Sequence, residues 1–216
     1  MVFALIFAGG VGSRMQSKEI PKQFLEVDGK PIIIHTIEHF AKHALVDNIV
    51  VVCLESWINE LKVYLERFNV KKVVSIIPGG KSGYQSIHNG LVRISETAKN
   101  DDIVLICDGV RPMLSEQLIS TCIMDTRLYG SAVPVTPSID SVLFSEDGVN
   151  CKKNYERKKI FITQAPQGYP MKRIMDAHKE AEERGIEAVS SADLLIELGQ
   201  EVHMFQGIRE NIKVTT

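Results

Sequence analysis

The chain has 216 residues, of which 44% are hydrophobic and 24% are charged. These are ordinary globular values, so they exclude a disordered or collagen-like chain. Lys and Arg total 25 against 27 Asp and Glu, a formal net charge of -2 that gives no reason to expect a nucleic-acid partner. The length favours one domain, so we expect residues 1–216 to form a single unit.

The apolar N-terminus favours a buried first strand over a targeting segment. Its apolar stretch is not preceded by a basic region, because Arg14, Lys18 and Lys22 all follow it. No apolar run reaches the length of a membrane span, so we expect a cytoplasmic protein without membrane contact. The cysteines have no CxxC spacing, which disfavours a zinc site or a disulfide framework. They are Cys53, Cys107, Cys122 and Cys151.

Apolar runs of strand length alternate with helical periodicities along most of the chain. The expected strands are 2–8, 48–53, 72–77, 102–107, 131–135 and 202–206. The expected helices are 31–42, 56–67, 83–97, 115–129, 170–184 and 191–198, with Ser56 and Ser115 as N-caps. Strands that are apolar on both faces and separated by helices predict an α/β fold. Its sheet should be mostly parallel, with helices on both faces.

This alternation breaks at about 137–160, where no helix-length pattern occurs. The stretch contains 141–144, the turn Glu146-Asp147-Gly148 and the charged run 152–159. We interpret it as a β-hairpin arm that projects from the domain. Such an arm buries little against its own core, and long insertions of this kind are usually functional or form an interface. We therefore expect residues near 141–153 to pack on a second subunit of a homodimer.

A glycine-rich turn follows the first strand and reads Ala8-Gly9-Gly10-Val11-Gly12-Ser13-Arg14-Met15. Glycines at such a position let backbone N–H groups approach a phosphate closely. The spacing matches neither the dinucleotide fingerprint nor the Walker loop. The cations Arg14, Lys18 and Lys22 beside this turn would suit a triphosphate. From the turn alone, a solvated basic loop is an equally good interpretation.

Two further loops follow expected strands. Asp108 and Arg111 come after 102–107, at the edge where open parallel sheets bind ligands. The carboxylate could hold a divalent cation, and the guanidinium could grip an anion. The alternative is a common Asp-Gly turn with a surface arginine. The loop 78–86 exposes N–H groups and hydroxyls that could bind a base or ribose, or it is a plain loop with Ser82 as an N-cap.

The remaining candidates carry little information individually. They are Arg157, Ala165-Pro166-Gln167 and the C-terminal run Asn211-Ile212-Lys213-Val214-Thr215. We expect Lys213 to lie in an apolar terminal strand, where a lysine more often extends along the surface than binds a ligand. Three histidines share one helix face, and ordinary surface histidines are favoured there over a metal site. They are His35, His39 and His43.

Taken together, these motifs resemble the cytidylyltransferases that activate sugar-alcohol phosphates. The matching elements, in chain order, are Ala-Gly-Gly-x-Gly-x-Arg-Met, Pro-Lys-Gln, Asp-x-x-Arg-Pro, x-Pro-Gln and Asn-Ile-Lys-Val-Thr. The resemblance spans Val2 to Thr216. It implies a Rossmann-like domain whose β-arm swaps across a homodimer. It also implies that a substrate phosphate attacks the α-phosphorus of CTP, with magnesium as cofactor and pyrophosphate as leaving group.

The resemblance also implies roles for individual residues. Arg14 and Lys22 would stabilise the transition state as catalytic cations, since phosphoryl chemistry depends mostly on positioned charge. Arg157 and Lys213 would position the acceptor phosphate, and Asp108 and Arg111 would lie between metal and acceptor, with Asp108 as the metal ligand. The residues expected to bind CTP are Phe7, Ala8, Gly9, Gly10, Gly12, Gly80, Lys81, Ser82 and Ser86.

Some positions depart from the family pattern. Lys81 and Gly83 stand where the family often has Asp and Arg, and Ala165 replaces the threonine of Thr-Pro-Gln. The segment 190–193 replaces an acidic-threonine element that helps to hold the sugar alcohol. Base, ribose and acceptor contacts should therefore differ in detail.

Several functions stay open at the sequence level. The runs 31–40 and 138–142 favour D-ribitol 5-phosphate as the acceptor, a precursor for cell-wall polymers. The helix 177–185 favours 2-C-methyl-D-erythritol 4-phosphate, an isoprenoid precursor. A nucleotide-binding module that has lost catalysis is a further alternative, which the presence of all the expected cations disfavours. A sugar-1-phosphate nucleotidyltransferase fits the last motifs less well.

Overall fold

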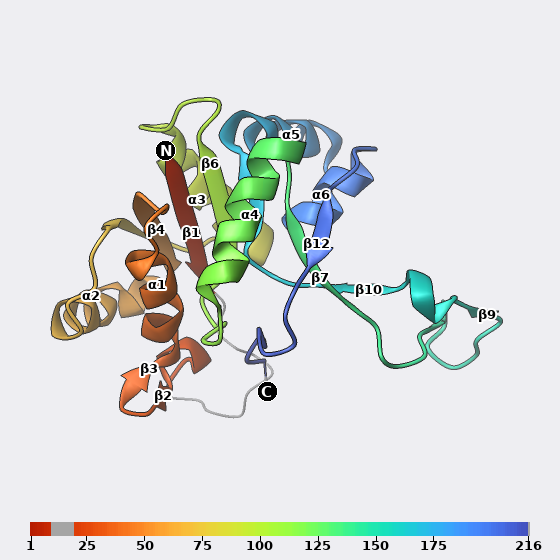
Figure 1. The fold of residues 1–216 in the computed structure, drawn as a ribbon, viewed down its shortest axis with the longest axis horizontal. Coiled ribbons are helices and arrows are strands. Elements are labelled where there is room, and N and C mark those ends of the chain that lie inside the picture. The colour runs from red at the N-terminus through yellow and green to blue at the C-terminus, as the bar shows by residue number, and fades with distance from the viewer. Residues whose placement is uncertain (10–19, 216) are drawn as a thin grey trace.

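A computed structural model describes residues 1–9 and 20–215 of the chain. Its central element is a five-stranded sheet with the strand order β11-β6-β1-β4-β5. Four strands are parallel neighbours, and β11 adds antiparallel to β6, so the sheet is mostly parallel as expected (Figure 1). The strands are β1 (Val2–Ala8), β4 (Asn48–Cys53), β5 (Val73–Pro78), β6 (Ile103–Asp108) and β11 (Gln167–Pro170).

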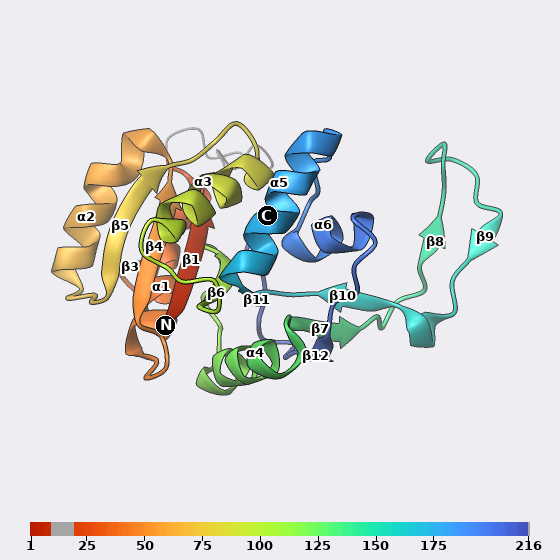
Figure 2. The ribbon, with the colours of Figure 1, turned by 90° about the horizontal axis from the view of Figure 1, so that it is seen from above.

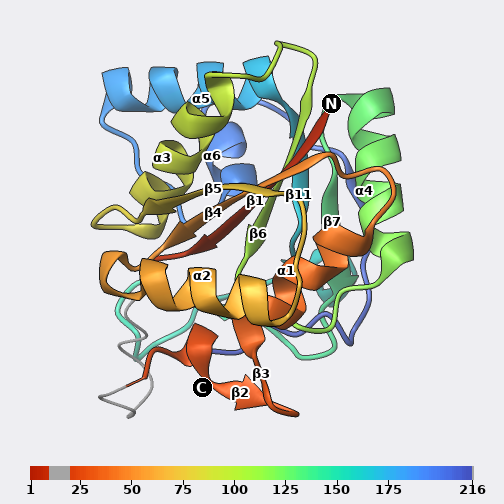
Figure 3. The ribbon, with the colours of Figure 1, turned by 90° about the vertical axis from the view of Figure 1, so that its left-hand side faces the viewer.

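Both faces of this sheet are buried because successive side chains of its inner strands point to opposite sides. In β1, Ala4 and Ile6 join one apolar cluster, whereas Phe3 and Leu5 join the other. The first cluster contains side chains of α1 (Ile32–Lys42), α2 (Ile58–Arg67) and α4 (Glu116–Tyr129). The second contains side chains of α3 (Gly83–Ser95), α5 (Met171–Arg184) and α6 (Ser191–Glu197). Figure 3 shows the sheet between these two groups of helices.

Serine side chains cap the N-termini of three helices. Ser82, Ser115 and Ser190 accept hydrogen bonds from the backbone N–H groups of Gln85, Leu118 and Asp193. The N-cap expected at Ser56 is wrong. This residue lies inside the 3₁₀ turn η2 (Glu55–Trp57), and Trp57 precedes α2 without a side-chain cap.

A second, smaller sheet extends the fold away from β5. It has the order β10-β7-β12, formed by β7 (Val133–Pro137), β10 (Phe161–Thr163) and β12 (Met204–Gln206). Between β7 and β10 the chain forms the expected antiparallel arm. It consists of β8 (Leu143–Phe144) and β9 (Lys153–Asn154), followed by the turn η3 (Arg157–Lys159). The arm projects well beyond the helices (Figure 2).

Several short strands were not expected from the sequence. They are β10, β11 and the pair β2 (Glu26–Val27) and β3 (Lys30–Pro31). Conversely, the terminal strand expected around Lys213 is wrong, because residues 207–215 form neither helix nor strand. All four cysteines are free thiols, and Cys53, Cys107 and Cys122 are buried. Within residues 1–9 and 20–215, no helix is long and apolar enough to cross a membrane.

Candidate active site

A cavity of about 600 Å³ opens at the carboxyl ends of the parallel strands. Ligands of open α/β sheets bind at this edge. Many of the residues that the sequence singled out line the cavity: Phe7, Ala8, Gly9, Lys22, Gly80, Lys81, Ser82, Ser86, Asp108 and Lys213. Arg111 and Arg157 are not among the lining residues. Gly10, Gly12 and Arg14 lie outside the described part of the chain.

Two glycines let the loops after β1 and β5 approach each other. A Cβ atom built on Gly9 would lie 3.2 Å from the Cα atom of Gly79 and 3.0 Å from Oγ of Ser86. A Cβ atom built on Gly79 would lie 3.0 Å from the Cα atom of Gly9. The absence of side chains at both positions therefore brings the two loops together on one wall of the cavity.

The loop after β5 is tied to the first turn of α3. The N–H of Gly80 donates to Oγ of Ser86 at 3.0 Å, and that hydroxyl donates to the carbonyl of Ser82 at 2.9 Å. The N–H of Lys81 donates to Oε1 of Gln85, while the Lys81 side chain is exposed at the cavity. The loop thus holds its shape through its own hydrogen bonds.

Lys22 reaches the cavity from the 3₁₀ turn η1 (Lys22–Phe24). Its neighbour Gln23 is 1% exposed, and the Gln23 amide donates to the carbonyl of Ala8 at 2.8 Å. This bond attaches η1 to the end of β1. Gln23 was not expected to have a role from the sequence. Its place in the Pro-Lys-Gln motif, next to Lys22, is the signal that indicates one.

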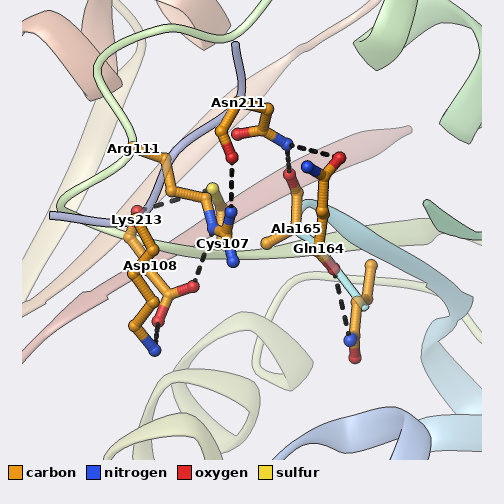
Figure 4. Close-up of polar contacts among 8 residues, drawn as sticks. Cys107, Asp108, Arg111, Gln164, Ala165, Asn211 and Lys213 are labelled. Atoms are coloured by element: carbon orange, nitrogen blue, oxygen red, sulfur yellow. Dashed lines mark hydrogen bonds and ion pairs between the residues drawn. The ribbon is translucent and has the colours of Figure 1, made fainter. Parts of the chain in front are cut away.

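Asp108 lies between two cationic side chains, as Figure 4 shows. Its Oδ2 atom is 3.0 Å from Nε of Arg111, and its Oδ1 atom is 2.6 Å from Nζ of Lys213. The side chains of Asp108 and Arg111 are 10% and 9% exposed, whereas that of Lys213 is 44% exposed. Arg111 is therefore a buried partner of the carboxylate and not a surface arginine. Of these three residues, Asp108 and Lys213 line the cavity, and Arg111 does not.

The described side chains at this cavity would hold a magnesium ion only together with the phosphates of a bound nucleotide. Among the described residues, no group of three or more His, Cys, Asp and Glu side chains could hold a metal. Among the described residues, the carboxylates that line the cavity are Asp108 and Glu55, and both oxygens of Asp108 face cations. Mg²⁺ is commonly held by one or two carboxylates together with substrate phosphates and water. This donor set fits an ion that arrives with a polyphosphate.

Arg157 lies in η3 at the base of the arm, and its guanidinium donates to the carbonyl of Ile139 at 3.4 Å. Residues 143–159 are all exposed in the single chain. Arg157 is not among the described residues that line the cavity of its own chain. The arm lies at the opposite end of the molecule from β1, β4 and β5 (Figure 2).

The expectation of three surface histidines on one helix face is wrong for His43, which follows α1 and is buried. His35 and His39 of α1, and His43, have separate partners. Nε2 of His35 pairs with the carbonyl of Val27, that of His39 with the carbonyl of Pro112 and that of His43 with the hydroxyl of Ser120. These contacts favour the interpretation of ordinary helix histidines over that of a metal site.

The comparisons with known proteins agree with this arrangement. The model of the family "IspD: 2-C-methyl-D-erythritol 4-phosphate cytidylyltransferase" matches residues 2–216. The chain belongs to this family. It is accordingly a CTP-dependent nucleotidyltransferase, as the order of its motifs predicted.

Several curated relatives that match the whole chain are named ribitol-5-phosphate cytidylyltransferase. A ribitol-5-phosphate cytidylyltransferase of Vibrio parahaemolyticus is 41% identical over all of this chain and 91% of its own length. A protein of the same name from Streptococcus agalactiae is 40% identical over all of this chain and 90% of its own length. A third, from Lacticaseibacillus paracasei, is 37% identical over all of this chain and 93% of its own length.

Solved structures of the cytidylyltransferase family share the fold. A Francisella tularensis 2-C-methyl-D-erythritol 4-phosphate cytidylyltransferase is 25% identical with a TM-score of 0.83, covering all of this chain and 94% of that one. A 4-diphosphocytidyl-2C-methyl-D-erythritol synthase from Anaerococcus prevotii is 23% identical with a TM-score of 0.84, covering all of this chain and 92% of that one. The expected Rossmann-like fold is thereby confirmed.

Proposed function

We propose that the chain transfers CMP from CTP to D-ribitol 5-phosphate and releases pyrophosphate. The observation that carries the acceptor is the full-length similarity, at 37–41% identity, to relatives named ribitol-5-phosphate cytidylyltransferase. Solved structures named for the methylerythritol phosphate reaction are only 22–25% identical. The acceptor 2-C-methyl-D-erythritol 4-phosphate remains the second candidate because the family model carries that name.

The reaction in this proposal exchanges one phosphoanhydride bond for another. An oxygen of the acceptor phosphate attacks the α-phosphorus of CTP, and the bond from that phosphorus to the bridging oxygen of the β-phosphate breaks. The electron pair leaves with pyrophosphate. No protein nucleophile is needed, so the protein contributes mainly position and positive charge.

CTP would bind along the wall formed by Gly9 and the loop 79–86. This wall exposes backbone and hydroxyl groups at the start of α3, where the helix dipole favours an anion. Lys22 and Lys81 line the same cavity. In the proposal, Lys22 acts as a catalytic cation on the triphosphate, together with Arg14 of the segment outside the described residues.

The acceptor phosphate would bind at the opposite wall, near Lys213. The side chain of this residue is 44% exposed, and its ammonium group lies beside Asp108 at the cavity. A magnesium ion entering with CTP would be held by Asp108 and the phosphates, and it would neutralise phosphate charge. Lys213 would supply positive charge to the acceptor phosphate at the same edge of the cavity.

We further propose that two chains form a homodimer through the arm. The arm exposes apolar side chains, with Leu143 65% and Val149 85% exposed, which favours an interface. In a dimer of this kind, Arg157 of one chain would reach the acceptor region of the other. This arrangement would explain why Arg157 lies far from the cavity of its own chain.

The proposal is tested by assaying pyrophosphate release from CTP with D-ribitol 5-phosphate and 2-C-methyl-D-erythritol 4-phosphate side by side. We expect kcat/KM to favour the ribitol compound by roughly tenfold or more, a transition-state difference of at least about 1.4 kcal/mol. A preference for the methylerythritol compound would assign the chain to the second candidate. CTP binding without release of pyrophosphate from CTP in the presence of either acceptor would contradict the enzymatic proposal and favour a binding module.

A further inference from the structure

The segment that carries Lys213 is held by hydrogen bonds and not by secondary structure. Residues 207–215 form neither helix nor strand, although Lys213 lies at the cavity. On one side of the lysine, the N–H of Val214 donates to the carbonyl of Val110 at 3.0 Å. On the other side, the segment is attached through Asn211. The position of the ammonium group therefore depends on these two anchors.

Asn211 attaches the segment to the chain just before β11. Its side chain is buried, with 1% of the residue exposed, and Nδ2 donates to the carbonyl of Ala165 at 2.6 Å. The same amide lies 3.5 Å from Oε1 of Gln164, whose own Nε2 donates to the carbonyl of Ile208 at 2.8 Å. These bonds join 208–211 to 164–165. Figure 4 shows those of Asn211 to Ala165 and Gln164.

Asn211 is also connected to the carboxylate of Asp108. The carbonyl of Asn211 accepts a hydrogen bond of 2.9 Å from Nη1 of Arg111, and Nε of the same guanidinium binds Asp108. The path from Ala165 through Asn211 and Arg111 to Asp108 consists of side chains that are almost fully buried. It ends at the carboxylate that contacts Lys213.

We infer that Asn211 is a positioning residue, which fixes Lys213 and the Arg111–Asp108 pair relative to the cavity; this inference rests on the proposed function. Asn211 does not line the cavity, so any effect on the reaction must pass through those neighbours. The amide NH₂ is the group that matters, since within the described residues the Oδ1 atom of Asn211 has no hydrogen-bond partner.

The chemistry of the amide suggests two informative substitutions. Asn211→Ala removes the donor and leaves the buried carbonyl of Ala165 without this partner. Asn211→Asp keeps nearly the same shape but places an oxygen, instead of a donor, 2.6 Å from the Ala165 carbonyl. If the donor positions the segment, Asn211→Asp should be at least as harmful as Asn211→Ala.

The test measures kcat and KM for the acceptor, together with CTP affinity by calorimetry, in the full-length chain. We expect Asn211→Ala to lower kcat/KM for the acceptor by about tenfold to a hundredfold, because small misplacements of a charged group are costly. CTP affinity should stay within about twofold of wild type. The acceptor used is whichever of the two phosphates the wild-type chain turns over.

A double-mutant cycle separates positioning from simple damage to the fold. If Asn211 acts through Lys213 and the Arg111–Asp108 pair, Asn211→Ala should lower acceptor kcat/KM less in a Lys213→Arg background, which keeps partial activity, than in the wild-type chain. Effects that multiply in full would contradict the inference. Thr126→Val is the matched control, since it also removes a buried hydrogen bond to a carbonyl, here that of Cys122 on α4. It should lower stability without changing acceptor KM.

A variant that fails to fold does not end the test. Gln164→Leu leaves Asn211 in place but removes the second bond that holds the segment, from Gln164 to the Ile208 carbonyl. Like Asn211→Ala, it should lower acceptor kcat/KM. Wild-type kinetics in Gln164→Leu, or in a folded Asn211→Ala, would overturn the inference alone. No turnover by the wild-type chain with either acceptor would overturn the proposed function and this inference with it.

Discussion

The polar side chains of the cavity are hydrogen-bonded to distant parts of the chain, whereas the described hydrogen bonds of the arm stay within the arm. Asp108 is joined to residues before β11 and near the C-terminus through buried hydrogen bonds. Between residues 140 and 159, the described hydrogen bonds stay within the segment 138–160, and the ring of Phe144 meets that of Tyr155 edge to face within the arm.

This difference indicates which parts of the site one chain can build alone. Among the described residues, the walls of the cavity are anchored within one chain: Gln23 attaches η1 to the end of β1, Ser86 attaches the loop after β5 to α3, and Arg111 holds Asp108. The arm has no apolar core to bury its exposed side chains, so a partner would be needed to fix it. Substitutions in the two regions should therefore fail in different ways.

The largest expected effect is at the cavity. Lys22→Ala should lower kcat by about 10²–10³-fold, since one preorganised charge at a transition state contributes about 3–4 kcal/mol. The melting temperature and the oligomeric state should stay close to those of the wild type, because Lys22 is only half-buried in a short turn. Steady-state turnover and calorimetric unfolding measure both. Turnover close to that of the wild type would contradict the assignment of Lys22.

The next effect separates the two substrates. Lys213→Ala should raise the acceptor KM steeply, or abolish turnover, while CTP affinity measured by calorimetry changes little. Lys213→Arg should rescue only in part, because a planar guanidinium addresses both phosphate and Asp108 differently from a compact ammonium. Equal weakening of CTP and acceptor would show that Lys213 serves the other ligand. Unchanged kinetics with a small loss of stability would make it a purely structural partner of Asp108.

Changes in the arm should act through assembly. The double substitution Leu143→Asp and Phe144→Asp places charges on two exposed apolar positions of β8. It should shift sedimentation from dimer to monomer at micromolar concentration and lower activity with it, while the unfolding of the main sheet is unchanged. A fully active monomer, in either the variant or the wild type, would contradict the proposed role of the arm.

The smallest effect concerns stability on the far side of the sheet from α1. His178 of α5 is 1% exposed, stacks on Tyr84 and lies near His88, both of α3. Within the described residues neither ring nitrogen of His178 has a hydrogen-bond partner. Burial, with a smaller contribution from His88, lowers the pKa of His178 from 6.5 to about 4.

The sign of the pH dependence follows from this shift. Between pH 6.5 and about 4 the unfolded chain binds a proton at His178 that the folded chain does not, so stability falls as the pH falls through this range. The loss should amount to about 3 kcal/mol. His178→Phe should remove this part of the pH dependence, measured by urea unfolding at several pH values against a baseline at pH 7.5. An unchanged slope would contradict the assignment.

The sequence was most informative where both faces of a strand are buried. The expected bounds of β1 and β4 are those observed, because continuous apolar runs between glycine and polar residues leave little choice of strand. The carboxyl-edge position of Asp108 and the loop 80–86 followed from the same pattern, since the ends of parallel strands meet at one edge. The N-caps expected at Ser82 and Ser115 are also confirmed, because an N-cap hydrogen bond joins residues close in the sequence.

Features that depend on distant contacts were not accessible in this way. The run at Asn211 looks like a strand, but its hydrogen bonds go to the Ala165 carbonyl and Arg111 instead of a sheet. The short strand β11 forms because it pairs with β6, and nothing in Gln167–Pro170 marks it as a strand. Gln23 and Glu55 were not assigned to the site, since their positions depend on how the loops fold.

The sharing of one catalytic site between two chains is tested most directly by mixing inactive variants. Lys22→Ala disables the cavity, and Arg157→Ala disables the arm. If the arm serves the partner's cavity, a mixed dimer has one site with both residues intact, and random exchange of subunits should restore roughly a quarter of wild-type activity. If each arm serves its own cavity, every site lacks one residue and mixing should restore no activity, which would contradict the account.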